Sequence, residues 1–189
     1  MPADEQGAIV ESGFGQGEDE YVWVTALVEN KSDRVGQTVT VSFNIKDDSG
    51  EVVSTTEQVE SFSSPGQMLA VGTQADLDPG VRAASVEATL LVEDENTFEG
   101  GDDLGTAKAE YKEGEYGESE ARYTVKNPTD KPVKDPRIGV ICKDKDGKVN
   151  GGGSDFPTLV PPNGEIKLAT YVIVSGAPEG CTAYVAPGF

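Results

Sequence analysis

The segment VENKSD, at positions 28–33, returns as VKNPTD at positions 125–130, which is 97 residues further along the chain. The segment KDDSGEV, at positions 46–52, returns at the same spacing as KDKDGKV, at positions 143–149. One register therefore holds for separated segments. A repeat of this size indicates two copies of one folding unit rather than the short units of a solenoid.

The repeat divides the 189 residues into two domains. We expect a disordered N-terminal tail over residues 1–6, a first domain over 7–95, an acidic linker over 96–103 and a second domain over 104–189. The linker bears glycine and lacks apolar periodicity, and its like charges repel one another, so we expect it to be extended.

Strand patterns dominate both units. Residues 38–45 alternate perfectly, with Val39, Val41, Phe43 and Ile45 on one face and threonine, serine and asparagine on the other. The expected strands are 21–28, 38–45, 51–59, 67–73 and 84–92 in the first unit and 105–111, 120–126, 137–143, 148–151, 165–174 and 181–186 in the second. We therefore expect an all-β chain of two tandem immunoglobulin-like antiparallel β-sandwich domains, and a small barrel is the alternative.

Cys142 and Cys181 are the only cysteines, and both lie in the second unit. In an immunoglobulin-like topology the third of these strands pairs antiparallel with the last, which brings the two residues side by side. We expect a disulfide and an oxidising compartment, whereas a free pair in a cytosolic protein is the alternative. Ile45 occupies the position of Cys142 in the first unit, which is expected to fold without a bridge.

The charge is strongly acidic and uneven. The formal net charge is −19, and residues 1–97 carry 4 basic and 19 acidic side chains, against 11 and 15 in residues 98–189. This field repels phosphate backbones and anionic lipid headgroups, so we expect no nucleic-acid partner, whereas a cationic partner is compatible with it. No apolar run approaches the roughly 18 residues of a membrane span, so we expect no direct membrane insertion.

The residues needed for common catalytic chemistry are missing. The chain has no histidine, which excludes Ser-His-Asp and Cys-His machinery and histidine metal sites. The run GGGS at 151–154 lacks the lysine of a phosphate-binding loop and predicts a flexible loop. The triplet DSG at 48–50 is that of aspartic proteases, but its counterpart in the second unit lacks the hydroxyl residue, which favours a turn. We expect the protein not to be an enzyme.

Two acidic hairpin tips are the candidate metal site. Clustered carboxylates suit calcium, but neither tip has the complete Asp-x-Asp-x-Asp-Gly loop with its distal glutamate, so solvated turns are the preferred interpretation. The candidate ligands are Asp47, Asp48, Asp144 and Asp146, with Asp102 and Asp103 of the linker as additions.

Trp23 and Tyr21 lie in one predicted strand whose two faces are both partly apolar. Core packing is therefore the preferred interpretation of these rings, and a carbohydrate-stacking platform is the alternative.

The segment FNIKD at 43–47, with VEN at 28–30 before it and GEVV at 50–53 after it, resembles the FxLYD family and related immunoglobulin-like domains of bacterial cell-envelope proteins. The second unit has VICKD at 140–144, which keeps the acidic end and lacks the aromatic start. The resemblance implies a β-sandwich on secreted proteins, lipoproteins or membrane-anchored proteins, and it supplies no catalytic residues.

These observations together favour a non-enzymatic, extracytoplasmic binding or spacer module of a secreted or cell-envelope-anchored protein. Its expected partner is a protein, whose identity the sequence leaves open along with the oligomeric state. The alternative is a calcium-stiffened adhesive or scaffold protein that uses the acidic hairpin tips, and calcium is the only cofactor that the sequence suggests.

Overall fold

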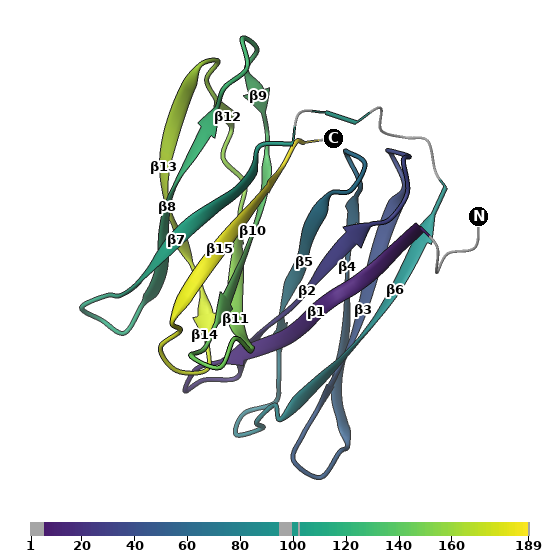
Figure 1. Ribbon diagram of the computed structural model, residues 1–189. Coiled ribbons are helices and arrows are strands. Elements are labelled where there is room, and N and C mark those ends of the chain that lie inside the picture. Colours follow the sequence, from purple (N-terminus) through teal and green to yellow (C-terminus); the bar gives the residue numbers. More distant parts are fainter. Residues whose placement is uncertain (1–5, 95–99, 102, 189) are drawn as a thin grey trace.

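The chain folds into antiparallel strands, as a computed structural model shows for residues 6–94, 100–101 and 103–188 (Figure 1). The predicted all-β antiparallel class is thus confirmed. The predicted tail and linker fall largely on residues 1–5, 95–99 and 102, which lie outside the described part. Gln6, the last residue of the predicted tail, is buried, and its carbonyl accepts a hydrogen bond from the backbone of Lys31.

The strands of the N-terminal half are β1 (Gly7–Gln16), β2 (Tyr21–Asn30), β3 (Thr38–Lys46), β4 (Val52–Ser61), β5 (Met68–Asp76) and β6 (Ser85–Glu93). Those of the C-terminal half are β7 (Gly105–Glu113), β8 (Ser119–Asn127), β9 (Val133–Lys134), β10 (Arg137–Lys143), β11 (Val149–Asp155), β12 (Leu159–Val160), β13 (Gly164–Tyr171), β14 (Ile173–Val174) and β15 (Gly180–Ala186).

The N-terminal half has two three-stranded sheets, in the orders β1-β2-β5 and β4-β3-β6. Their facing side chains form one apolar core, in which Val24, Val41 and Phe43 are fully buried. Strand β3 buries every second side chain against the opposite sheet, and this burial explains the alternation of apolar and polar residues over 38–45.

The C-terminal half is a curled seven-stranded sheet in the order β13-β8-β7-β15-β10-β11-β14, with β9 and β12 as a separate pair. Strands β13 and β14 lie at opposite ends of this order, yet only Val172 separates them along the chain. The sheet must therefore curl until its two end strands approach one another. It encloses a second core that includes Tyr123, Val140 and Cys142.

The first strands of the two halves, β1 and β7, differ in the strands with which they pair. Strand β1 pairs with β2 along its whole length, from Gly7 opposite Asn30 to Gln16 opposite Val22. Strand β7 pairs with β8 only over 110–113 and with β15 over its earlier part. This change of partner joins the strands of the C-terminal half into one sheet.

The sequence repeat reappears in the hydrogen bonds. Asn30 Oδ1 accepts hydrogen bonds from the backbone nitrogen and the hydroxyl of Ser32. Asn127 Oδ1 accepts the same pair from Thr129, 97 residues later. The two side-chain amides also donate to equivalent carbonyls, those of Arg34 and Lys131. One local structure therefore occurs twice.

The strand prediction differs from the structure in several places: the short strands β9 and β12 were missed, and the predicted strand 165–174 is divided at Val172 into β13 and β14. Strand β1 was not predicted, because glycines and a bulge between Ile9 and Glu11 break the alternation of its side chains. The run 151–154 was predicted as a flexible loop, but it lies within β11, and its three glycines are buried. Its glycines are required by close packing rather than by flexibility, since a Cβ on Gly152 would collide with the carbonyl oxygen of Val140.

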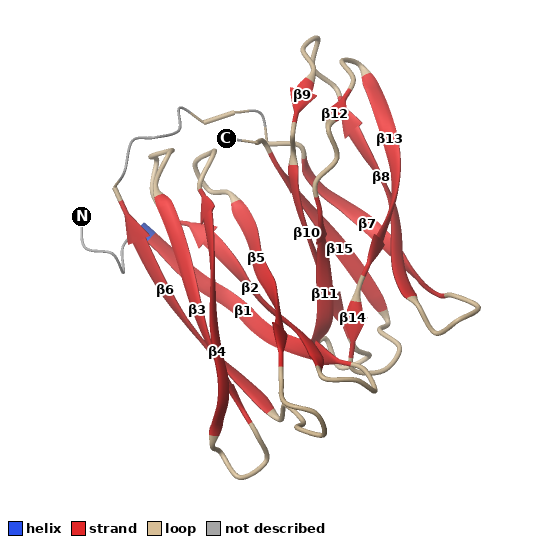
Figure 2. Ribbon diagram, turned by 180° about the vertical axis from the view of Figure 1, so that it is seen from behind, coloured by secondary structure: helices blue, strands red, loops and turns tan. Residues whose placement is uncertain are grey.

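The two halves pack against each other. Strands β1, β2 and β5 contact β10, β11, β14 and β15, so a sheet of the N-terminal half faces part of the curled sheet. Strand β1 runs diagonally towards β11 and β14, where the halves come closest, and Figure 2 shows the same arrangement from behind. A small apolar cluster around Leu27, Ala70 and Ile141 lies between the two larger cores.

Candidate functional site

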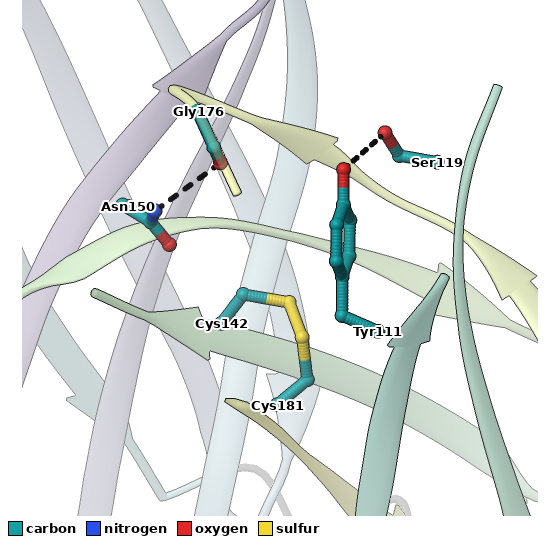
Figure 3. The surroundings of a disulfide bond; sticks show 6 residues. All are labelled: Tyr111, Ser119, Cys142, Asn150, Gly176 and Cys181. Atoms are coloured by element: carbon teal, nitrogen blue, oxygen red, sulfur yellow. Dashed lines mark hydrogen bonds between the residues drawn. A yellow bond between two sulfur atoms is a disulfide. The ribbon is translucent and has the colours of Figure 1, made fainter. Parts of the chain in front are cut away.

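The predicted disulfide is confirmed. Cys142 on β10 and Cys181 on β15 are direct register partners with a Cα–Cα separation of 4.0 Å, and they form a disulfide. Figure 3 shows the ring of Tyr111 beside this bond, with its hydroxyl 2.9 Å from the hydroxyl of Ser119. In the N-terminal half Ile45 pairs with Val86 at the equivalent place.

The predicted metal ligands act as turn acceptors. Asp47 Oδ1 accepts hydrogen bonds from the hydroxyl of Ser49 at 2.6 Å and from the backbone nitrogens of Ser49 and Glu51 at 2.9 and 3.1 Å. The Ser49 hydroxyl is the main cause that holds the pKa of Asp47 below its usual value. Asp144 Oδ1 likewise accepts from the backbone nitrogens of Asp146 and Lys148, at 2.9 and 3.0 Å.

The neighbouring carboxylates, Asp48 and Asp146, are exposed at these tips. Across the described residues, no group of three or more histidine, cysteine, aspartate or glutamate side chains is arranged to hold a metal ion. Asp103 accepts a hydrogen bond from the backbone of Gly105, whereas Asp102 lies outside the described residues. Calcium binding stays a prediction.

Trp23 packs between the halves and is buried as predicted, whereas Tyr21 is 39% exposed, so core packing was wrong for that ring. The Trp23 side chain is 8% exposed, and a Cβ on Gly72 or Gly152 would lie 2.9 or 3.0 Å from its indole nitrogen. Glycines of both halves therefore form the surfaces that receive the ring. The same holds where β1 approaches β11, because a Cβ on Gly13 would lie 2.7 Å from Cβ of Val149.

Charged groups also join the halves. Arg137 on β10 donates two hydrogen bonds to the carboxylate of Glu60 on β4, at 2.6 and 2.9 Å, and this pairing is the main cause that raises the pKa of Arg137. The guanidinium lies 4.9 Å from the ring centre of Phe156. A second ion pair joins Lys143 to Glu11 at 2.8 Å. Bidentate geometry and partial burial make the Glu60–Arg137 pair a fixed contact.

A groove lies where loops of both halves meet, and we call it the tyrosine groove. It has a volume of about 630 Å³ and is formed by the loop at 17–19, the β7–β8 hairpin and the segment from β13 to the β14–β15 connection. Three tyrosines line it: Tyr111, Tyr116 and Tyr171. Tyr116 is 89% exposed and Tyr171 is 58% exposed. Large aromatic side chains left in solvent at one place indicate an interaction surface.

The tyrosine groove is acidic. Of the described residues that line it, Glu18, Asp19 and Glu113 are acidic and none is basic. Arg82 approaches from outside the lining, where its guanidinium donates to the carbonyl of Gly17 at 2.7 Å. The positive charge of Arg82 offsets part of the negative charge of the groove, and its hydrogen bond to Gly17 holds the loop at 17–19 in place.

The backbone of the β7–β8 hairpin presents Tyr116 outwards. Gly117 adopts φ of +79°, and its backbone nitrogen donates to the carbonyl of Gly114, which closes a tight turn around Tyr116. Glycine is favoured at such a φ because a side chain is strained there. None of the three tyrosines that line the groove was predicted from the sequence as a site residue. The available signal was EGEYGE at 113–118, because an aromatic residue at a glycine-rich turn has no core to enter.

Comparison with protein-family models gives no match, and comparison with curated proteins finds no similar protein. The likeness to FxLYD domains therefore stays a prediction. None of the helical structure in the described residues is long and apolar enough to cross a bilayer.

Proposed function

We propose that this protein is a non-enzymatic binding module that holds a cationic segment of a protein partner in the tyrosine groove. The observation that carries the proposal is the groove itself, which joins loops of both halves and exposes Tyr116 and Tyr171. Tyrosine suits such a role because it offers a large contact area and a polar tip while it loses little side-chain entropy on binding.

The charge of the groove supports a cationic partner. A lysine or arginine over the face of a tyrosine gains about 0.5–1 kcal/mol at an exposed site, and more when it is desolvated. Glu18, Asp19 and Glu113 line the same groove, and their negative charges add to the attraction of a cation. The net charge of −19 also steers a cation towards the protein from a distance.

The contacts between the halves support the same proposal. Gln16, directly before the loop at 17–19, donates its backbone nitrogen to the hydroxyl of Ser175 at 2.9 Å, which fixes this loop beside the β14–β15 connection that also lines the groove. A binding surface that is fixed before contact loses less entropy on binding than one that must first be ordered. The second half thereby completes a site that neither half forms alone.

The proposal includes two tandem immunoglobulin-like domains in an extracytoplasmic compartment. Two observations support the domain assignment. Core residues of the two halves correspond at a sequence offset of 97, and the asparagine turn occurs once in each half. The Cys142–Cys181 bridge is weak support for an oxidising compartment, since structural disulfides persist mainly there. The likeness to FxLYD domains points to the same location.

Titration with synthetic peptides tests the proposal. We expect a lysine-rich peptide to bind in calorimetry and to shift the amide signals of the β7–β8 hairpin and the loop at 17–19. The same peptide with acetylated lysines should bind at least about tenfold more weakly, because the cation is lost. The Tyr116→Ala, Tyr171→Ala double variant should lose affinity to a similar degree.

The matched control is Leu91→Ala, which truncates an exposed apolar side chain on β6, away from the groove. Its affinity for the lysine-rich peptide should equal that of the unmodified protein. Equal binding of the charged and acetylated peptides, or unchanged affinity in the tyrosine double variant, would contradict the proposal.

A further inference from the structure

Strand β8 has a free edge over half its length. It pairs with β13 from Glu120 to Asn127, but it pairs with β7 only over 119–122. Beyond Arg122, β7 has turned away to β15. Over 123–127, the edge of β8 that faces away from β13 therefore has no partner strand in the part of the chain that the structure describes.

In the N-terminal half, the corresponding edge of β2 is occupied by strand β1. Residues 26–30 of β2 precede 123–127 of β8 by 97 positions, and β1 pairs with all of them. Ile9 and Phe14 of β1 also pack against the core of that half. The repeat thus supplies an internal example of a strand seated at this position.

In the C-terminal half the vacant position is a groove, which we call the strand-acceptor groove. Its volume is about 760 Å³, and Leu104, Ala107, Val125 and Val185 line it. Ala107 and Ala109 of β7 are small, and Leu104 and Ala107 are only partly buried. Apolar surface of the second core is therefore open to a side chain from outside.

The rims of this groove are more basic than the rest of the molecule. The charged side chains that line it are Lys108, Glu110, Arg122, Lys126 and Glu179. Arg122 pairs with Glu120, whereas Lys108 on one rim and Lys126 on the other have no ion pair with any described residue. In a chain of net charge −19, two lysines that line one groove and form no ion pair within the described part favour an acidic occupant.

From this free edge, open core and pair of lysines, we propose that the C-terminal half binds an extended acidic segment of another protein as an added strand beside β8. The added strand runs antiparallel to β8, as β1 does to β2. Backbone hydrogen bonds to 123–127 supply affinity, alternate apolar side chains enter the groove, and acidic side chains contact Lys108 and Lys126. This site adjoins the tyrosine groove, because Tyr111 lines both, but it uses the free edge of β8 at 123–127 and does not rest on the proposed function.

A peptide of this chain's own sequence serves as the probe. The segment DEQGAIVESG, positions 4–13, carries three acidic residues and includes the residues that occupy the equivalent edge in the N-terminal half. Added to the intact protein with blocked ends, it should shift the amide signals of 123–127 and slow their hydrogen exchange. A peptide with Ile9→Pro should bind at least about tenfold more weakly, because proline removes a backbone donor and disfavours a strand.

Three protein variants complete the test. Ala107→Phe fills the groove and should abolish binding, and the Lys108→Glu, Lys126→Glu pair should weaken it at least about tenfold. The matched control, Lys145→Glu with Lys148→Glu, reverses two exposed charges at the β10–β11 tip and should retain at least about half of the affinity. The proposal is overturned if the shifts map to β2 instead of β8, if Ala107→Phe binds as well as the unmodified protein, or if the proline peptide binds equally.

Discussion

At the scale of single residues, two buried asparagines fix the ends of β2 and β8. Asn30 and Asn127 are 1% and 2% exposed, and each satisfies all its side-chain polar groups with backbone and hydroxyl partners. A buried amide of this kind favours one backbone conformation of the surrounding turn, since any other conformation leaves its donors and acceptor without hydrogen-bond partners.

Asn127→Ala should destabilise the C-terminal half by about 2–3 kcal/mol, because it removes the hydrogen bonds of this side chain to the carbonyls of Lys131 and Val160 and to the backbone nitrogen of Thr129. Urea denaturation followed by amide signals of β8 and β13 measures the change. Asn44→Ala, on the outward face of β3, is the control and should change stability by less than about 0.5 kcal/mol. A loss no larger than that of the control would contradict the assigned role of Asn127.

Some residue roles could be predicted from the sequence and others could not. The pairing of Cys142 with Cys181 followed from strand order, and the acidic tips were correctly interpreted as turns. The glycines at 151–153 were misinterpreted, because composition alone cannot distinguish a loop from a strand that another surface approaches closely. The carbonyl of Val140 and the indole of Trp23 both approach Gly152 closely, and neither neighbour can be identified from the local sequence.

At the scale of elements, the strands with alternating or β-branched sequences were predicted within a few residues. Strand β3 illustrates why, since one of its faces is buried along its whole length. Besides its glycines and bulge, strand β1 escaped prediction because both of its faces are covered in part, one by the core of its own half and the other by β11. The alternation that identifies a strand with one exposed face is then lost.

The disulfide joins β10 and β15 covalently. Its two cysteines are 39 positions apart in the sequence, so it closes a loop of that length in the unfolded chain. The Cys142→Ala, Cys181→Ala double variant should lose about 3–4 kcal/mol of stability in the C-terminal half, because the unfolded chain regains freedom. Hydrogen exchange that compares β10 with β3 locates the loss. A reducing agent should destabilise the unmodified protein and leave the double variant unchanged, and a loss spread equally over both halves would contradict this account.

At the scale of the whole molecule, the contact between the halves was not predicted. An extended linker was expected to separate two independent units. The interface depends on residues distant in sequence, such as Glu60 with Arg137 and Gly13 with Val149, and neither pair carries a local pattern. The tyrosine groove escaped prediction for the same reason, because it exists only once the loop at 17–19 meets the β7–β8 hairpin.

Close glycine packing gives a sharp test of this interface. Gly13→Ala places a Cβ 2.7 Å from Cβ of Val149 and should force the halves apart. Gly17→Ala is the matched control, since a Cβ there has no neighbour within 4 Å and should leave the arrangement unchanged.

The two halves form one fixed body, and the distance between two spin labels, one in each half, tests this arrangement. Nitroxide labels at Ser42→Cys on β3 and Lys167→Cys on β13 report the separation of exposed positions in the two halves, while the native cysteines remain bridged. We expect one narrow distance distribution, which is preserved in Gly17→Ala and shifted or broadened in Gly13→Ala. A broad distribution in the otherwise unmodified protein would contradict this arrangement.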